Sequence, residues 1–343
     1  MKRILVAGIG GASLGTEIAK CLARVPGRYT ALGCDISPRA YGHYGDLFAE
    51  SFLVDRAHYV ESVLGVCRRA GVDCIIPGGE EPMVLLARAS AELAQNGVAL
   101  AANDSRLMAR FSDKQQTFET LEALGFPIPR SVTLATPKEA PLLDGMTFPC
   151  VVKPATGSGG SSFVFLAEDR DEAMVYVSYV CRSGRKALIQ EYLPETEGEF
   201  TIGVLSLPGG RTVGAIALRR LFDCKLSTLL KVPTGIISSG YSQGLIDEFP
   251  ALCADAVRIA TAIGSVGPIN VQGRVVVGKL IPFEINPRFS ASTYLRALAG
   301  FNEVDLYLRA VLDGEEVTRP EIRPGYYLRS LTETFVEPRA LKQ

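Results

Sequence analysis

One stretch of the chain, PINVQGRVVVGKLIPFEINPRFS at residues 268–290, predicts both a local fold and a chemical site. Two apolar runs flank Gly278, which is the pattern of a β-hairpin. If the turn centres on Gly278, then Gln272 and Glu284 lie opposite one another, because each is six residues away from that glycine.

The polar side chains of this hairpin suit a bound metal ion. Side chains alternate between the two faces of a strand, so Glu284, Asn286 and Arg288 are expected on one face. The oxygens of Gln272, Glu284 and Asn286 are hard ligands of the kind that Mg²⁺ prefers and shares with substrate phosphates. Arg288 beside them would supply a guanidinium fork for a phosphate. A solvated edge would explain one or two of these residues, but not four.

Length and composition limit the classes of protein that remain. The 343 residues are enough for two or three domains, and 47% hydrophobic against 21% charged residues excludes a disordered chain. A net charge of -1 argues against nucleic acid as the main partner, although it allows a nucleotide. Since no apolar stretch approaches the roughly 18 residues of a membrane span, we expect a cytoplasmic protein with no membrane partner.

The first hundred residues alternate between strand and helix patterns. Strands are expected at 2–7, 29–34 and 72–77, and helices at 14–25, 59–70 and 82–96. This alternation predicts an α/β domain with a parallel sheet and right-handed crossovers.

The glycine-rich turn after the first strand leaves two interpretations open. Asp35 ends the second strand, where an acidic residue would hold the ribose of a dinucleotide. The glycine spacing fits poorly, since Ser13 is the third position counted from Gly8 and Ala12 is the second counted from Gly10. A structural or substrate-facing turn is therefore favoured over an NAD site.

Acidic residues follow the expected strand at 72–77. Open α/β sheets bind ligands at the carboxyl ends of their strands, so Glu80 is a candidate substrate contact. The alternative is a solvated helix N-terminus, where carboxylates complement the helix dipole.

A lysine followed by a loop of small residues marks the middle of the chain. Lys153 ends one expected strand, and the Gly- and Ser-rich loop at 157–162 leads into the next. The loop could place N–H and hydroxyl groups around phosphate oxygens, and a plain hairpin turn is the alternative. It is not a Walker A loop, because the lysine precedes the glycines. Further on, Glu199 begins a strand and holds its carboxylate at a fixed place.

Taken in order, these motifs resemble the ATP-grasp superfamily, and most of all its carbamoyl-phosphate-synthase-like carboxylate ligases. The resemblance covers nearly the whole chain, and Asn270-Val-Gln272 with Glu284-Ile-Asn286-Pro-Arg288 is its most specific element. It implies an α/β and α+β architecture in four parts. These are a Rossmann-like pre-ATP-grasp domain at 1–102, a helical linker at 103–147, a small subdomain with the phosphate loop at 148–193, and a C-terminal subdomain with the metal site at 194–343.

The resemblance also implies roles for individual residues. Lys153 and Arg288 would be catalytic, and Gln272, Glu284 and Asn286 would hold Mg²⁺ or Mn²⁺. The expected ATP contacts are Lys114, Lys153, Ser158, Gly159, Gly160, Ser161, Glu191, Leu193 and Glu199. The basic segment at 219–231 departs from any single subgroup. Its Arg219, Arg220 and Lys231 are candidate contacts for an anionic substrate, or an ordinary solvated charge cluster.

The implied activity is that of an ATP-dependent ligase acting on small molecules. A carboxylate would be activated as an acylphosphate with release of ADP, and an amine or ammonia would then form an amide. Another ATP-grasp reaction, of carboxylase or kinase type, and a non-catalytic nucleotide-binding protein are the alternatives, and a homodimer is allowed. A complete carbamoyl-phosphate synthase contains two such ATP-grasp modules, whereas this sequence contains one. We therefore do not expect it to make carbamoyl phosphate from bicarbonate and ammonia alone.

Overall fold

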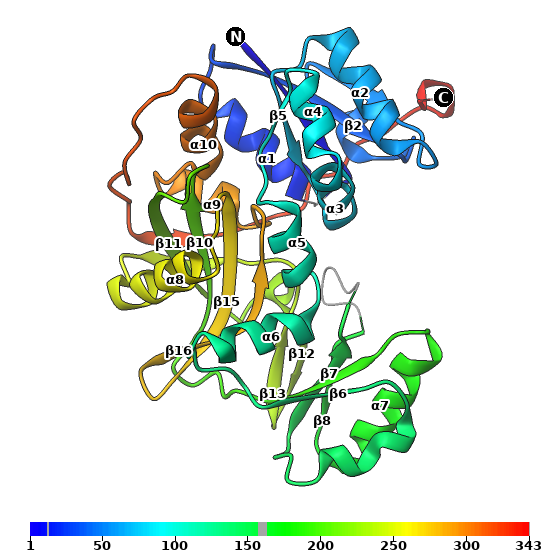
Figure 1. The fold of residues 1–343 in the computed structure, drawn as a ribbon, viewed down its shortest axis with the longest axis vertical. Coiled ribbons are helices and arrows are strands. Elements are labelled where there is room, and N and C mark those ends of the chain that lie inside the picture. Colours follow the sequence, from blue (N-terminus) through cyan, green and yellow to red (C-terminus); the bar gives the residue numbers. More distant parts are fainter. Residues whose placement is uncertain (12–13, 157–162, 343) are drawn as a thin grey trace.

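Four β-sheets organise the chain in the computed structural model, which describes residues 1–11, 14–156 and 163–342. In Figure 1 the five-stranded N-terminal sheet lies at the top, the six-stranded sheet in the middle and the four-stranded sheet at the bottom. A two-stranded ribbon completes the set. Within the described ranges, no helix has both the length and the apolar character needed to cross a membrane.

The N-terminal sheet is parallel throughout, as the alternation of strand and helix patterns predicts. Its strands, in the spatial order β3-β2-β1-β4-β5, are β3 (Glu50–Leu53), β2 (Tyr29–Asp35), β1 (Lys2–Ala7), β4 (Cys74–Pro77) and β5 (Ala99–Leu100). The chain passes from β3 at one edge to β4 beyond β1. The border between β1 and β4 is therefore a topological switch point.

Helices cover both faces of this sheet, namely α1 (Leu14–Ala23), α2 (Tyr59–Ala70), α3 (Glu80–Arg88) and α4 (Ser90–Gln95). Successive residues of β1 face opposite ways, so Ile4 packs in the core that contains α1 and Leu5 in the core that contains α2. The helix expected at 82–96 is in fact two helices that meet at Ala89. The short strands β3 and β5 have no counterpart in the sequence pattern.

Close backbone packing explains the glycine-rich turn. A Cβ atom on Gly15 would lie 1.9 Å from the Gly8 carbonyl oxygen, and one on Gly78 would lie 2.1 Å from the same atom. The Asp35 carboxylate accepts the Ile9 N–H at 2.8 Å, which ties the turn to the end of β2. These contacts supply a steric reason for the glycines that needs no dinucleotide.

Helices α5 (Ser105–Phe111) and α6 (Lys114–Ala123) lead into an antiparallel sheet of order β6-β9-β7-β8. Its strands are β6 (Ser131–Leu134), β7 (Cys150–Pro154), β8 (Phe165–Ala167) and β9 (Ala187–Glu191). Helix α7 (Arg170–Arg182) packs against this sheet, and the short 3-10 helix η2 (Pro137–Leu143) lies between β6 and β7 in the chain. Ser131 pairs with Gln190. This sheet therefore begins inside the segment 103–147, which the sequence analysis expects to be the helical and linker part of the ATP-grasp region.

The six-stranded sheet contains the predicted hairpin. In spatial order its strands are β16 (Lys279–Asn286), β15 (Pro268–Val276), β10 (Glu199–Ser206), β11 (Thr212–Arg220), β14 (Gly244–Asp247) and β17 (Gly325–Tyr327). Gln272 pairs with Glu284 across β15 and β16, which confirms the predicted pair. The register nearer the turn differs from the prediction, because Val276 pairs with Lys279 and a register shift between Gln272 and Gly273 brings Gln272 opposite Glu284. Gly278 lies in the turn with a φ of 69°, a conformation that favours glycine.

Further elements surround this sheet. Helix α8 (Pro250–Ala262) packs on β10 and β11, whereas α9 (Thr293–Leu298) and α10 (Glu303–Leu312) pack on α1. Strands β12 (Thr228–Val232) and β13 (Gly235–Ser238) form the two-stranded ribbon. The contacts of α9 and α10 join the N-terminal and six-stranded sheets into one hydrophobic core.

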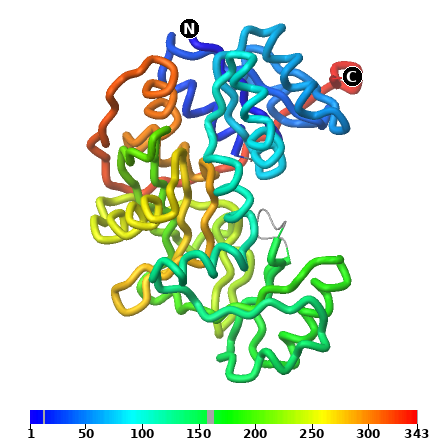
Figure 2. The backbone as a smooth tube through the Cα atoms, in the orientation of Figure 1, coloured from blue at the N-terminus to red at the C-terminus, as the bar shows by residue number. Residues whose placement is uncertain are grey.

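After β17 the chain returns to the N-terminal domain, and in Figure 2 its red end lies beside the blue strands. Arg329 anchors this returning segment. Its guanidinium pairs with Glu17 of α1 at 3.1 Å and donates to the carbonyl oxygens of Ser242 and Ala291. Both side chains of the ion pair are buried, at 6% and 3% exposure. Arg329 thus links α1 to two loops of the other domain.

The steric account of the turn predicts the effect of Gly15→Ala. The new Cβ would meet the Gly8 carbonyl, and forcing atoms into a packed interior costs about 1–3 kcal/mol. Urea denaturation should report this loss. Gly10→Ala should remain near the wild type, because no described residue beyond its two chain neighbours has an atom within 4 Å of the new Cβ. Equal stability of the two variants would contradict the account.

Removal of the Arg329 side chain should destabilise the link between domains. Arg329→Met leaves Glu17 buried, and breaking a buried ion pair costs about 3–5 kcal/mol, with the lower end expected because Lys20 still pairs with Glu17. Thermal unfolding measures the loss. Arg339→Met, in an exposed pair with Glu337, is the control and should change little. The double variant Glu17→Gln/Arg329→Met should recover part of the stability.

Candidate active site

A cavity of about 430 Å³ lies where the three large sheets approach one another. Glu80 lines it from the N-terminal domain, and Lys153 and Glu191 line it from the four-stranded sheet. Gln272 and Glu284 line it from the hairpin of the six-stranded sheet. Residues from distant parts of the chain therefore line one cavity.

The hairpin presents its polar side chains to this cavity. Gln272 lies opposite Glu284, with its Nε2 atom 3.3 Å from the Glu284 Oε2 atom, and Asn270 lies opposite Asn286. Arg288 follows, with its Nη2 atom 3.4 Å from the Asn286 Oδ1 atom. The residues predicted for metal and phosphate contact are therefore brought together. They contain one carboxylate, and no group of three or more His, Cys, Asp or Glu with metal-site geometry occurs in the described ranges.

Arg288 is a half-buried cation that faces carboxylates. Burial lowers the pKa of its guanidinium, while the charges of Glu284 and Glu80 raise it. Its Nη1 atom donates to the Phe289 carbonyl oxygen at 2.9 Å. The Glu80 carboxylate forms no hydrogen bond or ion pair with any residue that the structure describes, although it lines the same cavity. An anionic ligand at Arg288 would therefore lie within reach of a carboxylate.

Lys153 is a second buried cation, with 6% of its surface exposed. Its Nζ atom donates to the Gln190 Oε1 atom at 2.9 Å and lies 3.4 Å from the Phe283 carbonyl oxygen. The pKa of Lys153 is lowered to about 7, mainly by burial and also by the charge of Lys114, while the charge of Glu284 opposes both effects. The negative charge of a bound phosphate would raise the pKa of this amine and favour its protonated form.

Lys153 and its neighbours leave capacity for a ligand. Lys114 lines the cavity at the start of α6, where its backbone N–H donates to the Ala155 carbonyl at 3.0 Å. The Nε2 atom of Gln190 is buried without a hydrogen-bond partner in the described structure. Buried donors of this kind are rare, so a bound acceptor is the natural complement.

The end of β9 and the residues that follow it form another wall, where Glu191 and Leu193 both line the cavity. Glu191 is fixed by a reciprocal pair of contacts, since its N–H donates to the Arg130 carbonyl at 2.8 Å and its carboxylate accepts the Arg130 N–H at 3.2 Å. The hydroxyl of Tyr192 accepts the Ile236 N–H at 2.6 Å. The segment is thus held between β6 and β13.

Glu199 lies in the cavity wall but is already paired. Only 1% exposed, it forms ion pairs with Arg274 at 2.9 Å and Arg220 at 3.5 Å. Arg220 also donates to the carbonyl oxygens of Ser239 and Tyr241 at 2.8 and 3.0 Å. The residues expected to contact ribose and substrate therefore form one buried ionic cluster, in which Arg220 orders a loop of the wall.

Arg274 is a residue of this cluster that the sequence analysis did not select. It lies directly opposite Glu199 in the pairing of β10 with β15. A signal was present, because residues 270, 272 and 274 alternate onto one face of β15. The same rule would have identified Thr201, which lies opposite Gln272.

Some expected residues are not brought to the cavity. Arg219 is exposed and lies outside it, because adjacent residues of β11 point to opposite faces and Arg220 takes the inward one. Lys231 is exposed on the two-stranded ribbon, also outside the lining. For these two residues the solvated-cluster alternative describes the structure better. Ser158, Gly159, Gly160 and Ser161 lie outside the described residues.

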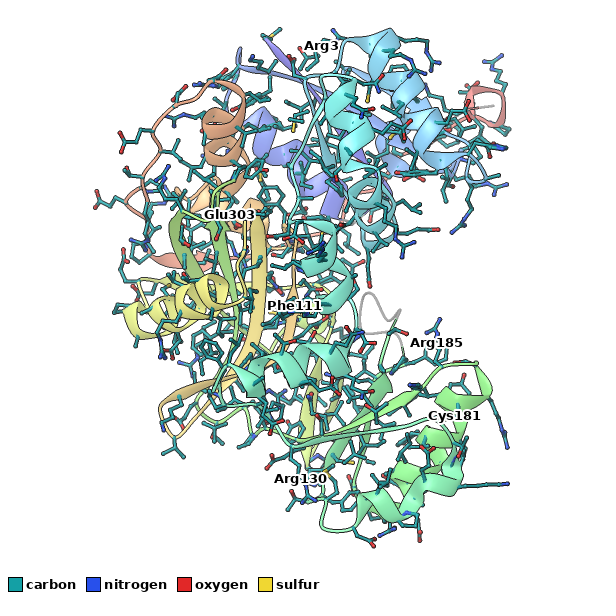
Figure 3. All side chains as sticks on the ribbon, in the orientation of Figure 1. Arg3, Phe111, Arg130, Cys181, Arg185 and Glu303 are labelled. Carbon is teal, nitrogen blue, oxygen red and sulfur yellow. The ribbon has the colours of Figure 1, made fainter. Side chains whose placement is uncertain are left out.

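A buried ionic group supports the hairpin from behind. Arg296 pairs with Glu303 at 3.0 Å and donates to the Asn270 Oδ1 atom at 2.5 Å, with neither charged side chain exposed. Figure 3 shows Glu303 beside the upper part of the six-stranded sheet. A Cβ on Gly203 would lie 2.2 Å from the Arg296 Nη1 atom, so only glycine leaves room there. This group orients the Asn270 amide, and no spacing in the sequence indicates it.

Comparison with known proteins identifies the fold. The N5-carboxyaminoimidazole ribonucleotide synthetase solved as an ADP complex superposes with a TM-score of 0.70 at 15% identity, covering 94% of this chain and 80% of that one. The L-amino acid ligase of Bacillus licheniformis superposes with a TM-score of 0.67 at 16% identity, covering 93% and 79%. At these identities the likeness concerns the fold.

Sequence comparison points in the same direction. The large chain of carbamoyl phosphate synthase from Pyrococcus furiosus is 30% identical over 193 residues, which cover 54% of this chain and only 18% of that protein. Residues 111–217 match the family model described as an ATP-grasp domain, and residues 183–334 match that described as ATP-grasp in the biosynthetic pathway with Ter operon. The two matches overlap, and this chain belongs to the ATP-grasp superfamily.

Proposed function

We propose that this protein is an ATP-dependent carboxylate–amine ligase that acts on small molecules. The observation that carries the proposal is the hairpin face, where Gln272 lies opposite Glu284 and Asn286 leads to Arg288. Lys153 lines the same cavity. A set of oxygen ligands flanked by the buried Lys153 and the half-buried Arg288 suits a nucleoside triphosphate with its metal ion and the carboxylate that it activates.

The donors fit a hard divalent cation. Glu284 supplies a carboxylate, and Gln272 and Asn286 supply amide oxygens, with no sulfur or imidazole ligand among them. These three residues would hold Mg²⁺, or Mn²⁺ in its place. When bound, the ion would neutralise phosphate charge.

The protein side chains have distinct tasks in the proposed reaction. A carboxylate oxygen of the substrate attacks the γ-phosphorus of ATP, the bond to ADP breaks, and an acylphosphate forms. Protonated Lys153 stabilises the phosphate oxygens, and Arg288 stabilises the charge that develops during transfer. The amine then attacks the acyl carbon, phosphate leaves, and the nitrogen loses a proton as the amide forms.

Other parts of the wall would position ATP. Lys114 is proposed to contact phosphate, and residues 191–193 to hold the adenine through backbone groups and the Glu191 side chain. Glu199 can accept ribose hydroxyls through the carboxylate lone pairs that its two arginines leave available. Gln190 would donate its unpartnered Nε2–H to an acceptor of the nucleotide.

Assays against a panel of carboxylates and amines test the proposal. ADP release should depend on one class of carboxylate, and hydroxylamine should trap the acylphosphate as a hydroxamate. ATP hydrolysis without dependence on any carboxylate would leave the ligase assignment unsupported. ADP release with a stable phosphorylated product and no hydroxamate would indicate a kinase instead.

Glu284→Ala should abolish ADP release, by a factor of at least about one hundred, because the carboxylate of the metal site is lost. Coupled-enzyme detection of ADP measures the effect. Lys279→Ala is the matched control, since that exposed side chain lies at the start of the same strand. Substantial turnover by the Glu284 variant would defeat the metal assignment.

The lowered pKa of Lys153 predicts proton uptake when ATP binds. With a pKa of about 7, the amine is partly neutral near pH 7, and phosphate raises its pKa in the complex. Affinity for ATP should therefore fall as pH rises above 7, by up to about tenfold per pH unit until the pKa of the complex is reached. Calorimetry in buffers of different ionisation enthalpy counts the protons.

Lys153→Arg is the control for this pH dependence, because a guanidinium stays protonated throughout the range. The variant should bind ATP without the contribution from Lys153 to proton uptake. If the wild type and the variant take up equal numbers of protons between pH 7 and 8.5, Lys153 is not the group responsible.

A further inference from the structure

A second cavity, of about 240 Å³, lies in the N-terminal domain. It is lined by Gly8 after β1, Asp35 at the end of β2 and Gly78 after β4, so it occupies the switch point of the parallel sheet. Open α/β sheets bind ligands in this crevice. We call it the switch-point cavity.

The switch-point cavity adjoins the active-site cavity but has a lining of its own. Gly78 and Gly79 line both spaces. The next two residues are acidic and face different cavities, since Glu80 lines the active-site cavity and Glu81 lines the switch-point cavity. Adjacent carboxylates therefore serve different spaces, which provides a matched pair for experiments.

An unpartnered hydroxyl points to a ligand here. Tyr59 is 8% exposed and lines the cavity, yet its phenol forms no hydrogen bond with any residue that the structure describes. Because the cavity reaches this side chain, a ligand there can take the hydrogen bond of the hydroxyl in place of water. The carboxylates of Asp35 and Glu81 lie close enough to raise the pKa of Tyr59 beyond the effect of its burial.

The charged groups of the lining sum to a negative charge. They are Asp35, Glu81 and Arg56. Arg56 is already neutralised, because its Nη2 atom contacts both Glu81 oxygens at 2.8 and 2.9 Å. Each Asp35 oxygen accepts one backbone N–H, from Ile9 or Ser37, and no other hydrogen bond to this carboxylate occurs among the described residues. An anionic ligand would therefore meet no unpaired cation in the described lining.

The remaining lining is apolar and comes from Ile36, Pro82 and Leu85. A ligand that complements both the acidic part and the apolar part of the lining has a positively charged group at one end and a hydrocarbon body at the other. We propose that the switch-point cavity binds a small organic ammonium compound, with its nitrogen at the side chains of Asp35, Tyr59 and Glu81. This site goes beyond the proposed ligation and does not depend on ATP.

Ligand-observed NMR titration of the full chain without ATP tests the proposal. The probe is n-butylammonium chloride, compared with 1-butanol and butyrate, which have similar hydrocarbon bodies and different charges. The ammonium should bind about tenfold more tightly than the alcohol, and butyrate should bind least, because the cavity is negatively charged.

Two rim variants should move the affinity in opposite directions. Glu81→Gln removes a negative charge and should weaken binding of butylammonium about tenfold, whereas Arg56→Gln removes the competing cation and should strengthen it. Both side chains are exposed, at 57% and 67%, so both variants should fold. A purely structural effect would not reverse its sign between them.

Tyr59→Phe and Glu80→Gln complete the design. Tyr59→Phe should weaken binding without lowering the melting temperature, since the lost hydroxyl has no partner in the described structure. Glu80→Gln, in the other cavity, should leave binding unchanged. No binding of butylammonium, equal binding of 1-butanol, tighter binding of adenosine, or equal losses from Glu80→Gln and Glu81→Gln would each overturn the proposal. Ligase assays run separately, so either proposal can fail alone.

Discussion

The pairing of β15 with β16 is the constraint on which the active site depends. Gln272 lies opposite Glu284, and the neighbouring pair is Asn270 with Asn286. A slip of one residue would turn every one of these side chains to the opposite face. The inward face contains an acid and three amides, whereas residues between them, such as Ile285, pack in the hydrophobic core. The same alternation that buries the apolar side chains therefore directs the polar ones into the cavity.

The buried charged side chains of this structure differ in whether an opposite charge lies beside them. Glu199 is paired with two arginines, and Arg296 is paired with Glu303 and hydrogen-bonded to Asn270. Such groups are satisfied within the protein and hold the walls in place. Lys153, by contrast, donates to an amide oxygen and a carbonyl oxygen, and within the described ranges it has no carboxylate as a hydrogen-bond partner. Burial without a paired carboxylate leaves this cation ready for a phosphate.

Much of the fold could be predicted from local patterns. Apolar runs placed the strands near residues 2–7, 29–34 and 72–77, and the parallel sheet followed from their alternation with helices. The short strands β3 and β5 were not predicted, because strands of four and two residues are too short to show a hydrophobic periodicity. The boundary at 148 missed β6, whose partner β9 lies more than fifty residues further along the chain. Pairings at that range leave no local signal.

The sequence by itself determined which polar side chains of the hairpin share one face, because residues of one strand or hairpin obey the two-residue alternation of β-structure. Glu284, Asn286 and the opposed Gln272 could therefore be grouped in advance. Only the tertiary structure decided which cations reach that site. It turned Arg220 inward and Arg219 outward, and it paired Glu199 with Arg274. Those outcomes depend on how separate elements pack, and packing against distant segments is not recorded in local spacing.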